Sequence, residues 1–323
     1  MSGNFLSNAP VWLNALIVLV TMLLIAKGAQ WVVVSASQLA KLLGLSELVI
    51  GLTVVAMGTS APEFAVTLIA GLKGHGNISV GNIVGSNIFN LGFILGGCAL
   101  VKAIPTSNKL VWRDGMVLFA ATVFLSIVVG VDLHLGRLEG ALMFTGLVLY
   151  IIYLLYQRDD SLVPEAVSSV ANHPLFKQCL MLGGGLVMIL ASSHLMVDAA
   201  VSIATDFGVS QWVIAVTIVA AGTSAPEIAT SLTGVLKGHY SLSAGNLIGS
   251  DLFNLLGVLG LAGMLQPVTT DPMARISLLA VTAMVIVTVF FMRTGWRISR
   301  LEGGLLVAFG LVRWGFDFTS WMA

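Results

Sequence analysis

The stretch "GTSAPE" at residues 58–63 places a proline and a carboxylate inside sequence that is apolar enough to lie in a membrane. The same six letters return at 222–227, again within apolar sequence. Lipid-exposed helices exclude both features, because unpaired backbone groups and charges are unfavourable in hydrocarbon. The two motifs therefore predict two interrupted helices that are surrounded by protein or line a water-filled cavity.

The composition indicates an all-α membrane protein. Of 323 residues, 57% are hydrophobic and 9% are charged, whereas soluble domains carry roughly a quarter charged residues. Apolar runs recur from end to end with a length of about 20 residues, which is the length at which an α-helix crosses a bilayer. The short segments of alternating polarity that are typical of transmembrane β-barrels are missing. We predict a polytopic bundle of transmembrane helices.

Ten transmembrane helices are predicted from the apolar runs. They cover approximately 11–34, 43–71, 79–101, 112–130, 137–156, 178–201, 208–235, 243–265, 274–292 and 301–321. The longest connection, over 157–177, contains charged residues and two prolines. We predict that it is a central linker loop between a first five-helix repeat at 1–156 and a second at 178–323.

The two halves are related in sequence. Residues 58–97 align without a gap with 222–261, and 22 of the 40 positions are identical. Each half has five predicted spans, so the second copy must enter the membrane from the opposite side. The sequence therefore predicts two inverted repeats, an architecture in which transporters place the substrate site at the midplane between the repeats.

The basic residues predict the orientation. Ten of the 15 Lys and Arg residues lie in connections on the side opposite the N-terminus, and four lie on the N-terminal side. Because cytoplasmic connections are enriched in basic residues, we expect both termini outside, in a prokaryotic cell (inner) membrane. No basic residue precedes the first apolar run, so we expect that span to be retained rather than cleaved. The formal net charge is zero, which gives no indication of a nucleic-acid partner.

The repeated motifs gather hard oxygen ligands. On a continuous helix, Thr59 and Ser60 would share a face with Glu63, while Pro62 would free the carbonyl of Gly58. In the next span a polar stripe recurs every four residues, and the second half repeats the whole set. The stripe consists of Asn82, Ser86 and Asn90, and the second copy consists of Thr223, Ser224, Glu227, Asn246, Ser250 and Asn254.

Inverted packing would bring Glu63 and Glu227 together. Two carboxylates in a low-dielectric site repel each other unless a cation lies between them or one of them holds a proton. A site made of oxygen ligands without Cys or well-placed His favours sodium, calcium or magnesium.

"GTSAPE" followed by "GSNIFN" or "GSDLFN", duplicated over ten predicted spans, resembles the sodium/calcium exchanger family of the calcium/cation antiporter superfamily. The resemblance implies an antiporter of Ca²⁺ and Na⁺ that is not an enzyme and needs no cofactor. It implies that Glu63 and Glu227 are shared ligands. It further implies hydroxyl or backbone ligands at Thr59, Ser60, Thr223 and Ser224, backbone carbonyls at Ala56 and Ala220, and side-chain ligands at Ser86, Asn90, Ser250 and Asn254.

One position bears on potassium. Some relatives, including potassium-dependent ones, have Asp where this chain has Asn254. The resemblance therefore implies that potassium is not required, although Asp251 could restore the missing charge.

Three other functions are compatible with parts of the sequence. A Ca²⁺/H⁺ exchanger, or another divalent cation/proton exchanger, could use the same scaffold, with the glutamates cycling through protonation. A metal-assisted intramembrane hydrolase would need histidines near the glutamates, but His75 and His239 lie 12 residues further along, or about 18 Å along a helix. An ion channel would need no alternating access. The hydroxyl groups of the motifs offer sodium extra ligands and favour Na⁺/Ca²⁺ exchange.

Overall fold

The computed structural model describes residues 9–156, 175–208 and 220–320 and is helical almost throughout. Within these residues seven helices are long and apolar enough to cross a membrane, and a bent helix pair raises the number to eight. α18 (Arg300–Ser320) is long enough but is not among these apolar helices. The predicted linker lies outside the described residues up to 174, as does 209–219 of the predicted seventh span.

The first half contains long helices that are interrupted by wider π-helical segments. In chain order its elements are α2 (Val11–Leu43), α3 (Glu47–Ile50), η1 (Gly51–Val55), α4 (Ala56–Thr59), α5 (Ala61–Leu72), α6 (Gly76–Phe89), η2 (Asn90–Leu95), α7 (Gly96–Val101), β1 (Ile104–Pro105), η3 (Lys109–Gly115), α8 (Met116–Asp132), β2 (His134–Leu135) and α9 (Arg137–Tyr156).

The second half repeats this order where it is described. Its elements are α11 (Leu175–Asp206), α13 (Ala220–Thr223), α14 (Ala225–Lys237), α15 (Tyr240–Leu252), η6 (Phe253–Leu259), α16 (Gly260–Leu265), β3 (Val268–Thr269), α17 (Met273–Arg293), η7 (Thr294–Trp296), β4 (Arg297–Ile298) and α18.

Both "GTSAPE" motifs interrupt a helix, as the sequence predicted. The helix from Glu47 to Thr59 meets α5 at an angle of 56°. Ser60 at this bend has φ −79° and ψ 13°, and the equivalent Ser224 has φ −89° and ψ 7°. In each case the proline lies in the first turn of the following helix, where its missing N–H removes no hydrogen bond.

Two small antiparallel sheets join the halves. β1 pairs with β4, so that Ile104 faces Ile298, and β2 pairs with β3, so that Leu135 faces Val268. β1 and β3 are equivalent strands of the repeat, as are β2 and β4, so the repeat exchanges the two sheets, which is an approximate (pseudo-) twofold symmetry. Each sheet fixes a connection of one half against a connection of the other.

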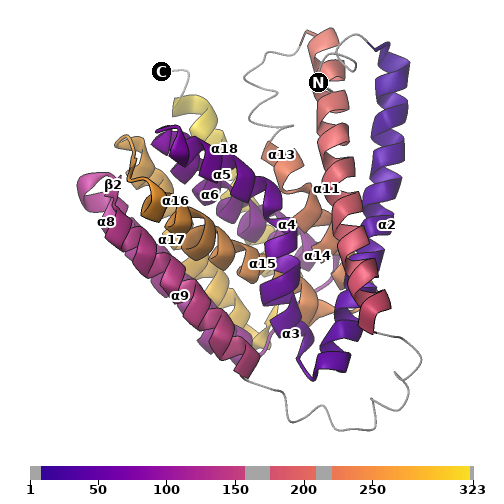
Figure 1. Cartoon of the computed structure of the whole chain (residues 1–323), viewed down its shortest axis with the longest axis horizontal. Coiled ribbons are helices and arrows are strands. Elements are labelled where there is room, and N and C mark those ends of the chain that lie inside the picture. The colour runs from indigo at the N-terminus through magenta and orange to yellow at the C-terminus, as the bar shows by residue number, and fades with distance from the viewer. Residues whose placement is uncertain (1–8, 157–174, 209–219, 321–323) are drawn as a thin grey trace.

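The helices form two groups in space. Figure 1 shows α2 and α11 side by side as a steep pair, while α8, α9, α16 and α17 lie together in a tilted bundle. The pair packs closely, since a Cβ atom on Gly28 would lie 2.9 Å from the carbonyl oxygen of Gly185. The start of α2 and the end of α18 lie toward the same side of the molecule (Figure 1). The interrupted helices lie between these two groups.

Candidate ion site

The two interrupted helices exchange hydrogen bonds across the repeats. Ser60 donates through its hydroxyl to Glu227 Oε1 at 3.0 Å, and Ser224 donates to Glu63 Oε1 at 3.3 Å. All four side chains are buried. The bend at Ser60 turns its hydroxyl away from the helical face expected from spacing alone, so each serine binds the glutamate of the other repeat. The structure thus brings Glu63 and Glu227 into one site.

Each glutamate retains one oxygen without a donor. Glu63 Oε2 and Glu227 Oε2 are buried and have no hydrogen-bond partner within the described parts of the chain. The negative charge of Glu227 also acts on Glu63. Buried, unpaired carboxylate oxygens are strongly unfavourable unless a cation or a proton compensates them. The arrangement can therefore hold a cation through oxygen ligands from both repeats.

Hydroxyl groups extend the site toward α15. Thr59 Oγ1 lies 3.4 Å from Ser250 Oγ and donates to Asn246 Oδ1 at 3.2 Å. Ser250 in turn donates to Glu227 Oε1 at 3.5 Å. These contacts place Thr59 and Ser250, both predicted ligands, beside Glu227.

Two predicted backbone ligands lie in the short helices before the breaks. The carbonyl of Ala56 accepts the Ser60 N–H at 3.0 Å, and the Thr59 hydroxyl oxygen lies 3.3 Å from it. Ala220 is the first residue of α13, the equivalent helix.

The remaining predicted ligands divide into two groups. Ser86 lines a cavity with Thr223 and Ser224. Asn90 and Asn254 instead hydrogen-bond to Asp251 and Asn87 respectively, at 2.9 and 3.2 Å. Asn87 was not identified from the sequence. The repeat contained a signal for it, because Asn87 aligns with Asp251, the one acidic residue of the "GSDLFN" motif.

Matching hydrogen bonds fix the interrupted helices against the next helix in each half. Asn82 donates to Thr67 Oγ1 at 2.9 Å, and Asn246 donates to Ser231 Oγ at 3.0 Å. These four residues are equivalent pairs in the repeat. Asn82 and Asn246 therefore orient α5 and α14, and with them Glu63 and Glu227.

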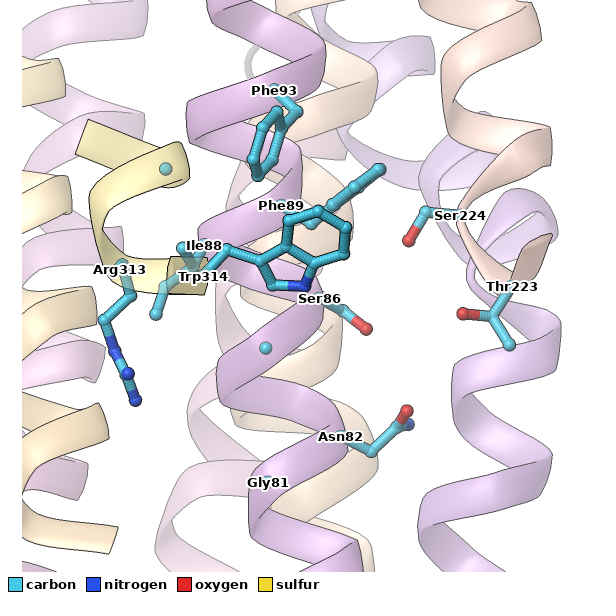
Figure 2. Close-up of a pocket in the computed structure, with 12 residues that line it drawn as sticks. Gly81, Asn82, Ser86, Ile88, Phe89, Phe93, Thr223, Ser224, Arg313 and Trp314 are labelled. Atoms are coloured by element: carbon cyan, nitrogen blue, oxygen red, sulfur yellow. The ribbon is translucent and has the colours of Figure 1, made fainter. Parts of the chain in front are cut away.

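Two cavities reach Thr223 at the second interrupted helix. A cavity of about 290 Å³ lies between α6 and the Thr223–Ser224 bend, and a second of about 610 Å³ reaches Thr223 from α11. Figure 2 shows Asn82 and Ser86 pointing across the first cavity toward Thr223, and Trp314 also lines this cavity. Thr59, the equivalent of Thr223, is 0% exposed, whereas Thr223 is partly exposed. For the described residues we therefore call the Thr223 side open and the Thr59 side closed.

Comparison with known proteins identifies the family. A family model described as "Sodium/calcium exchanger protein" matches residues 13–158 and 177–312. The chain belongs to this family. The resemblance inferred from the repeated motifs is thereby confirmed, and the family consists of transporters rather than enzymes. With its apolar helices, the chain is an integral membrane protein.

Several relatives in the sodium/calcium exchanger family match over nearly their whole length. "Putative antiporter CaxA" of Alkalimonas amylolytica is 39% identical, over 90% of this chain and 94% of CaxA. Inner membrane protein YrbG of Escherichia coli is 33% identical, over 92% and 94%. Sodium/calcium exchanger MaX1 of Methanosarcina acetivorans is 31% identical, over 93% and 97%.

Solved structures match as well. The sodium–calcium exchanger NCX_Mj, soaked with zero Na⁺ and Ca²⁺, superimposes with a TM-score of 0.83 at 26% sequence identity. The match covers 94% of this chain and 98% of NCX_Mj. The chain is therefore a cation antiporter of this family by sequence and by fold.

Proposed function

We propose that the protein exchanges Ca²⁺ for Na⁺ across the membrane by alternating access to a midplane site. The observation that carries this proposal is the crossed pair of bonds from Ser60 to Glu227 and from Ser224 to Glu63, which leaves one buried oxygen of each glutamate unpaired. Two carboxylates match the charge of one Ca²⁺ or two Na⁺. Ca²⁺ and Na⁺ are its partners in transport, and no cofactor is needed.

The proposed ligand set is the one the sequence predicted. Glu63 and Glu227 are the shared carboxylates, and hydroxyl, amide and backbone oxygens complete the coordination. These oxygens belong to Thr59, Thr223, Ser60, Ser224, Ser86, Ser250, Asn90, Asn254, Ala56 and Ala220. The hydroxyl groups favour sodium as the exchanged ion because they supply neutral oxygen ligands. Two similar proteins that carry the name sodium/calcium exchanger, MaX1 and NCX_Mj, support the same choice.

The proposed architecture is ten transmembrane helices in two inverted five-helix repeats, at 1–156 and 178–323, with a linker at 157–177. The symmetry-related sheets and the equivalent hydrogen bonds at Asn82 and Asn246 support it. We place both termini outside a prokaryotic inner membrane because of the distribution of basic residues.

Coupling follows from the charge of the site. An empty site would carry about two negative charges through the occluded state, which is costly by several kcal/mol. Calcium or two sodium ions neutralise that charge, so only loaded forms switch between the two sides. One flux is therefore tied to the other.

The decisive experiment measures calcium-45 uptake into proteoliposomes under imposed sodium, potassium or proton gradients. We expect uptake that is driven by a sodium gradient and is independent of potassium. Uptake driven by a pH gradient without sodium would assign the protein to the proton-coupled alternative.

The site itself is tested by substitution. Glu63→Gln should abolish sodium-driven uptake, with a loss of about 100-fold or more, because it removes a charged ligand and a source of coupling. Glu139→Gln, the same change at the half-buried start of α9, serves as the control and should retain uptake. Near-normal exchange by Glu63→Gln in folded protein would contradict the proposed site.

A further inference from the structure

Asp251 and Asn87 occupy equivalent positions of the two repeats and take part in one hydrogen-bond network. Asn90 donates through Nδ2 to Asp251 Oδ1 at 2.9 Å, and Asn254 donates through Nδ2 to Asn87 Oδ1 at 3.2 Å. These two bonds are related by the pseudo-twofold symmetry. All four side chains are buried, at 0 or 1% exposure. In each half, the last asparagine of the motif thus donates to the equivalent side chain of the other half.

The symmetry of this network fails at the side chain of residue 251. Asn87 donates its amide to the main-chain carbonyl of Asp251 at 3.2 Å. The reciprocal donor would be an amide on residue 251, but that residue is an aspartate. Its Oδ2 is buried and has no hydrogen-bond donor in the part of the chain that the structure describes. The sequence thus replaces a donor by an acceptor at the centre of the protein.

This acceptor is not isolated. Asn90 Oδ1 and Asn254 Oδ1, the free ends of the two amides, are also buried without a donor. Ser250, the residue before Asp251, donates to Glu227 Oε1 at 3.5 Å, so the network adjoins the glutamate site. Among the described residues Asp251 makes no salt bridge. Buried charges are paired or coordinate a metal, and here no Lys or Arg supplies the pairing.

The three carboxylates do not surround one ion. No group of three Asp, Glu, His or Cys residues within the described ranges converges closely enough to hold a single metal. Asp251 Oδ2 therefore belongs to a subsite next to the one between Glu63 and Glu227. One carboxylate with two neutral amide oxygens carries a single negative charge, which matches a monovalent cation.

We propose that Asp251 is a ligand of a separate Na⁺ subsite, which it forms with the amide oxygens of Asn90 and Asn254. This inference rests on the proposed function, because it adds a sodium ion to an exchanger whose calcium ligands are Glu63 and Glu227. Asp251 then determines how many sodium ions are bound at once and has little part in binding calcium.

The test uses equilibrium binding to the purified full-length protein in detergent, by isothermal titration calorimetry with NaCl and with CaCl₂ separately. Asp251→Asn should weaken sodium binding by about tenfold or more, because a charged ligand is lost. The Hill coefficient for sodium should fall by about one relative to wild type. Calcium affinity measured without sodium should stay within about threefold, whereas Glu63→Gln should lose calcium binding. Sodium binding by Asp251→Asn that matches wild type in affinity and Hill coefficient would overturn the proposal, since Asp251 would then be a neutral hydrogen-bonding group.

A second variant keeps the test decisive if Asp251→Asn does not give monodisperse protein. The double substitution Asn87→Asp with Asp251→Asn moves the carboxylate to the equivalent position and preserves both symmetric bonds. It should bind sodium within about threefold of wild type, because the subsite keeps one carboxylate and the same two amides. Loss of sodium binding by about tenfold or more in this folded variant would contradict the assignment of Asp251 as a ligand within a symmetric network. If wild type binds both ions but performs no exchange, the proposed function fails, while the sodium subsite is still decided by the binding data.

Discussion

Gly85 and Gly249 occupy equivalent positions in α6 and α15 but meet opposite surroundings. A Cβ atom on Gly249 would lie 2.6 Å from the backbone of Leu52, whereas a Cβ atom on Gly85 would meet nothing within 4 Å. Gly245 and Gly81, one turn earlier, differ in the same way. Gly81 and Gly85 line the cavity that reaches Thr223. On the closed side, α15 therefore packs directly against Leu52 at Gly249. On the open side, the equivalent Gly85 has no such neighbour among the described residues and faces the cavity.

This difference predicts that α6 packs closely at Gly85 when the protein switches to the state that is open on the other side. Gly85→Ala should leave the free energy of unfolding and calcium binding of this state nearly unchanged but slow exchange by about tenfold or more, because a methyl group would obstruct packing after the switch. Gly249→Ala should destabilise this state by about 1–3 kcal/mol through its contact with Leu52. Detergent melting curves and calcium-45 exchange separate the two effects. Gly97→Ala, whose Cβ also meets nothing within 4 Å but does not line the cavity, is the control. Exchange by Gly85→Ala at the control's rate would contradict the prediction.

The crossed serines should contribute to ion binding from both repeats. Ser60→Ala removes the serine hydroxyl that donates from the first repeat's break to Glu227, and Ser224→Ala removes the equivalent donor to Glu63. Each should weaken calcium binding by about tenfold, since each removes a hydroxyl that both orients a carboxylate and offers an oxygen. Ser126→Ala, which removes a bond to Thr282 away from the site, should bind calcium normally. Unchanged calcium affinity in Ser60→Ala, measured by titration calorimetry, would argue against a direct role.

Glu47, the first residue of α3, contacts α2 and the turn before α15 on the closed side. Its Oε1 accepts a hydrogen bond from Ser37 of α2 and lies 2.9 Å from Nδ1 of His239, in the turn before α15. Glu47→Ala should shift the state equilibrium by about tenfold toward the opposite opening, because it removes bonds to a charged group worth about 1–3 kcal/mol.

Thiol labelling measures that shift. Thr59→Cys, in a background with Cys98 and Cys179 replaced by Ala, reports on the closed side because the equivalent Thr223 lines the open cavities. Glu47→Ala should accelerate labelling. Glu302→Ala is the control, since Glu302 accepts hydrogen bonds from Thr294 and Ser299, which lie within the same half and precede it closely in the chain. Equal labelling rates in the two variants would refute the role of Glu47.

Asp114 and Tyr150 should affect stability without affecting transport. Asp114 is 0% exposed and accepts hydrogen bonds from the Tyr150 hydroxyl at 2.7 Å and from Arg113 Nε at 2.6 Å. Tyr150→Phe should lower the free energy of unfolding by about 1–3 kcal/mol, because a buried carboxylate loses a donor. Tyr153→Phe, at a residue that is 48% exposed, should have little effect. Melting in detergent tests the difference, and a change in exchange rate per folded molecule would show that Asp114 also serves transport.

The sequence by itself determined the class of protein and predicted the chemistry of its site. Apolar runs of bilayer length require transmembrane helices, and Pro62 and Pro226 within such runs require interrupted ones. Repetition of the motif identified Glu63 and Glu227 as partners, because the same chemistry occurs once in each half. Family membership, the interrupted helices and the convergence of the two glutamates agree with that expectation.

Only the tertiary structure decided which groups meet. Helical spacing placed Ser60 on the face of Glu63, but the bend at Ser60 directs its hydroxyl to Glu227. Spacing also grouped Asn90 and Asn254 with the serines, whereas they bind Asp251 and Asn87. Periodicity gives the face of a helix but not the partner across it. A nearly symmetric sequence, moreover, encodes two equivalent arrangements and cannot specify which side is open. That choice depends on packing between the helices, as at Gly249 and Leu52.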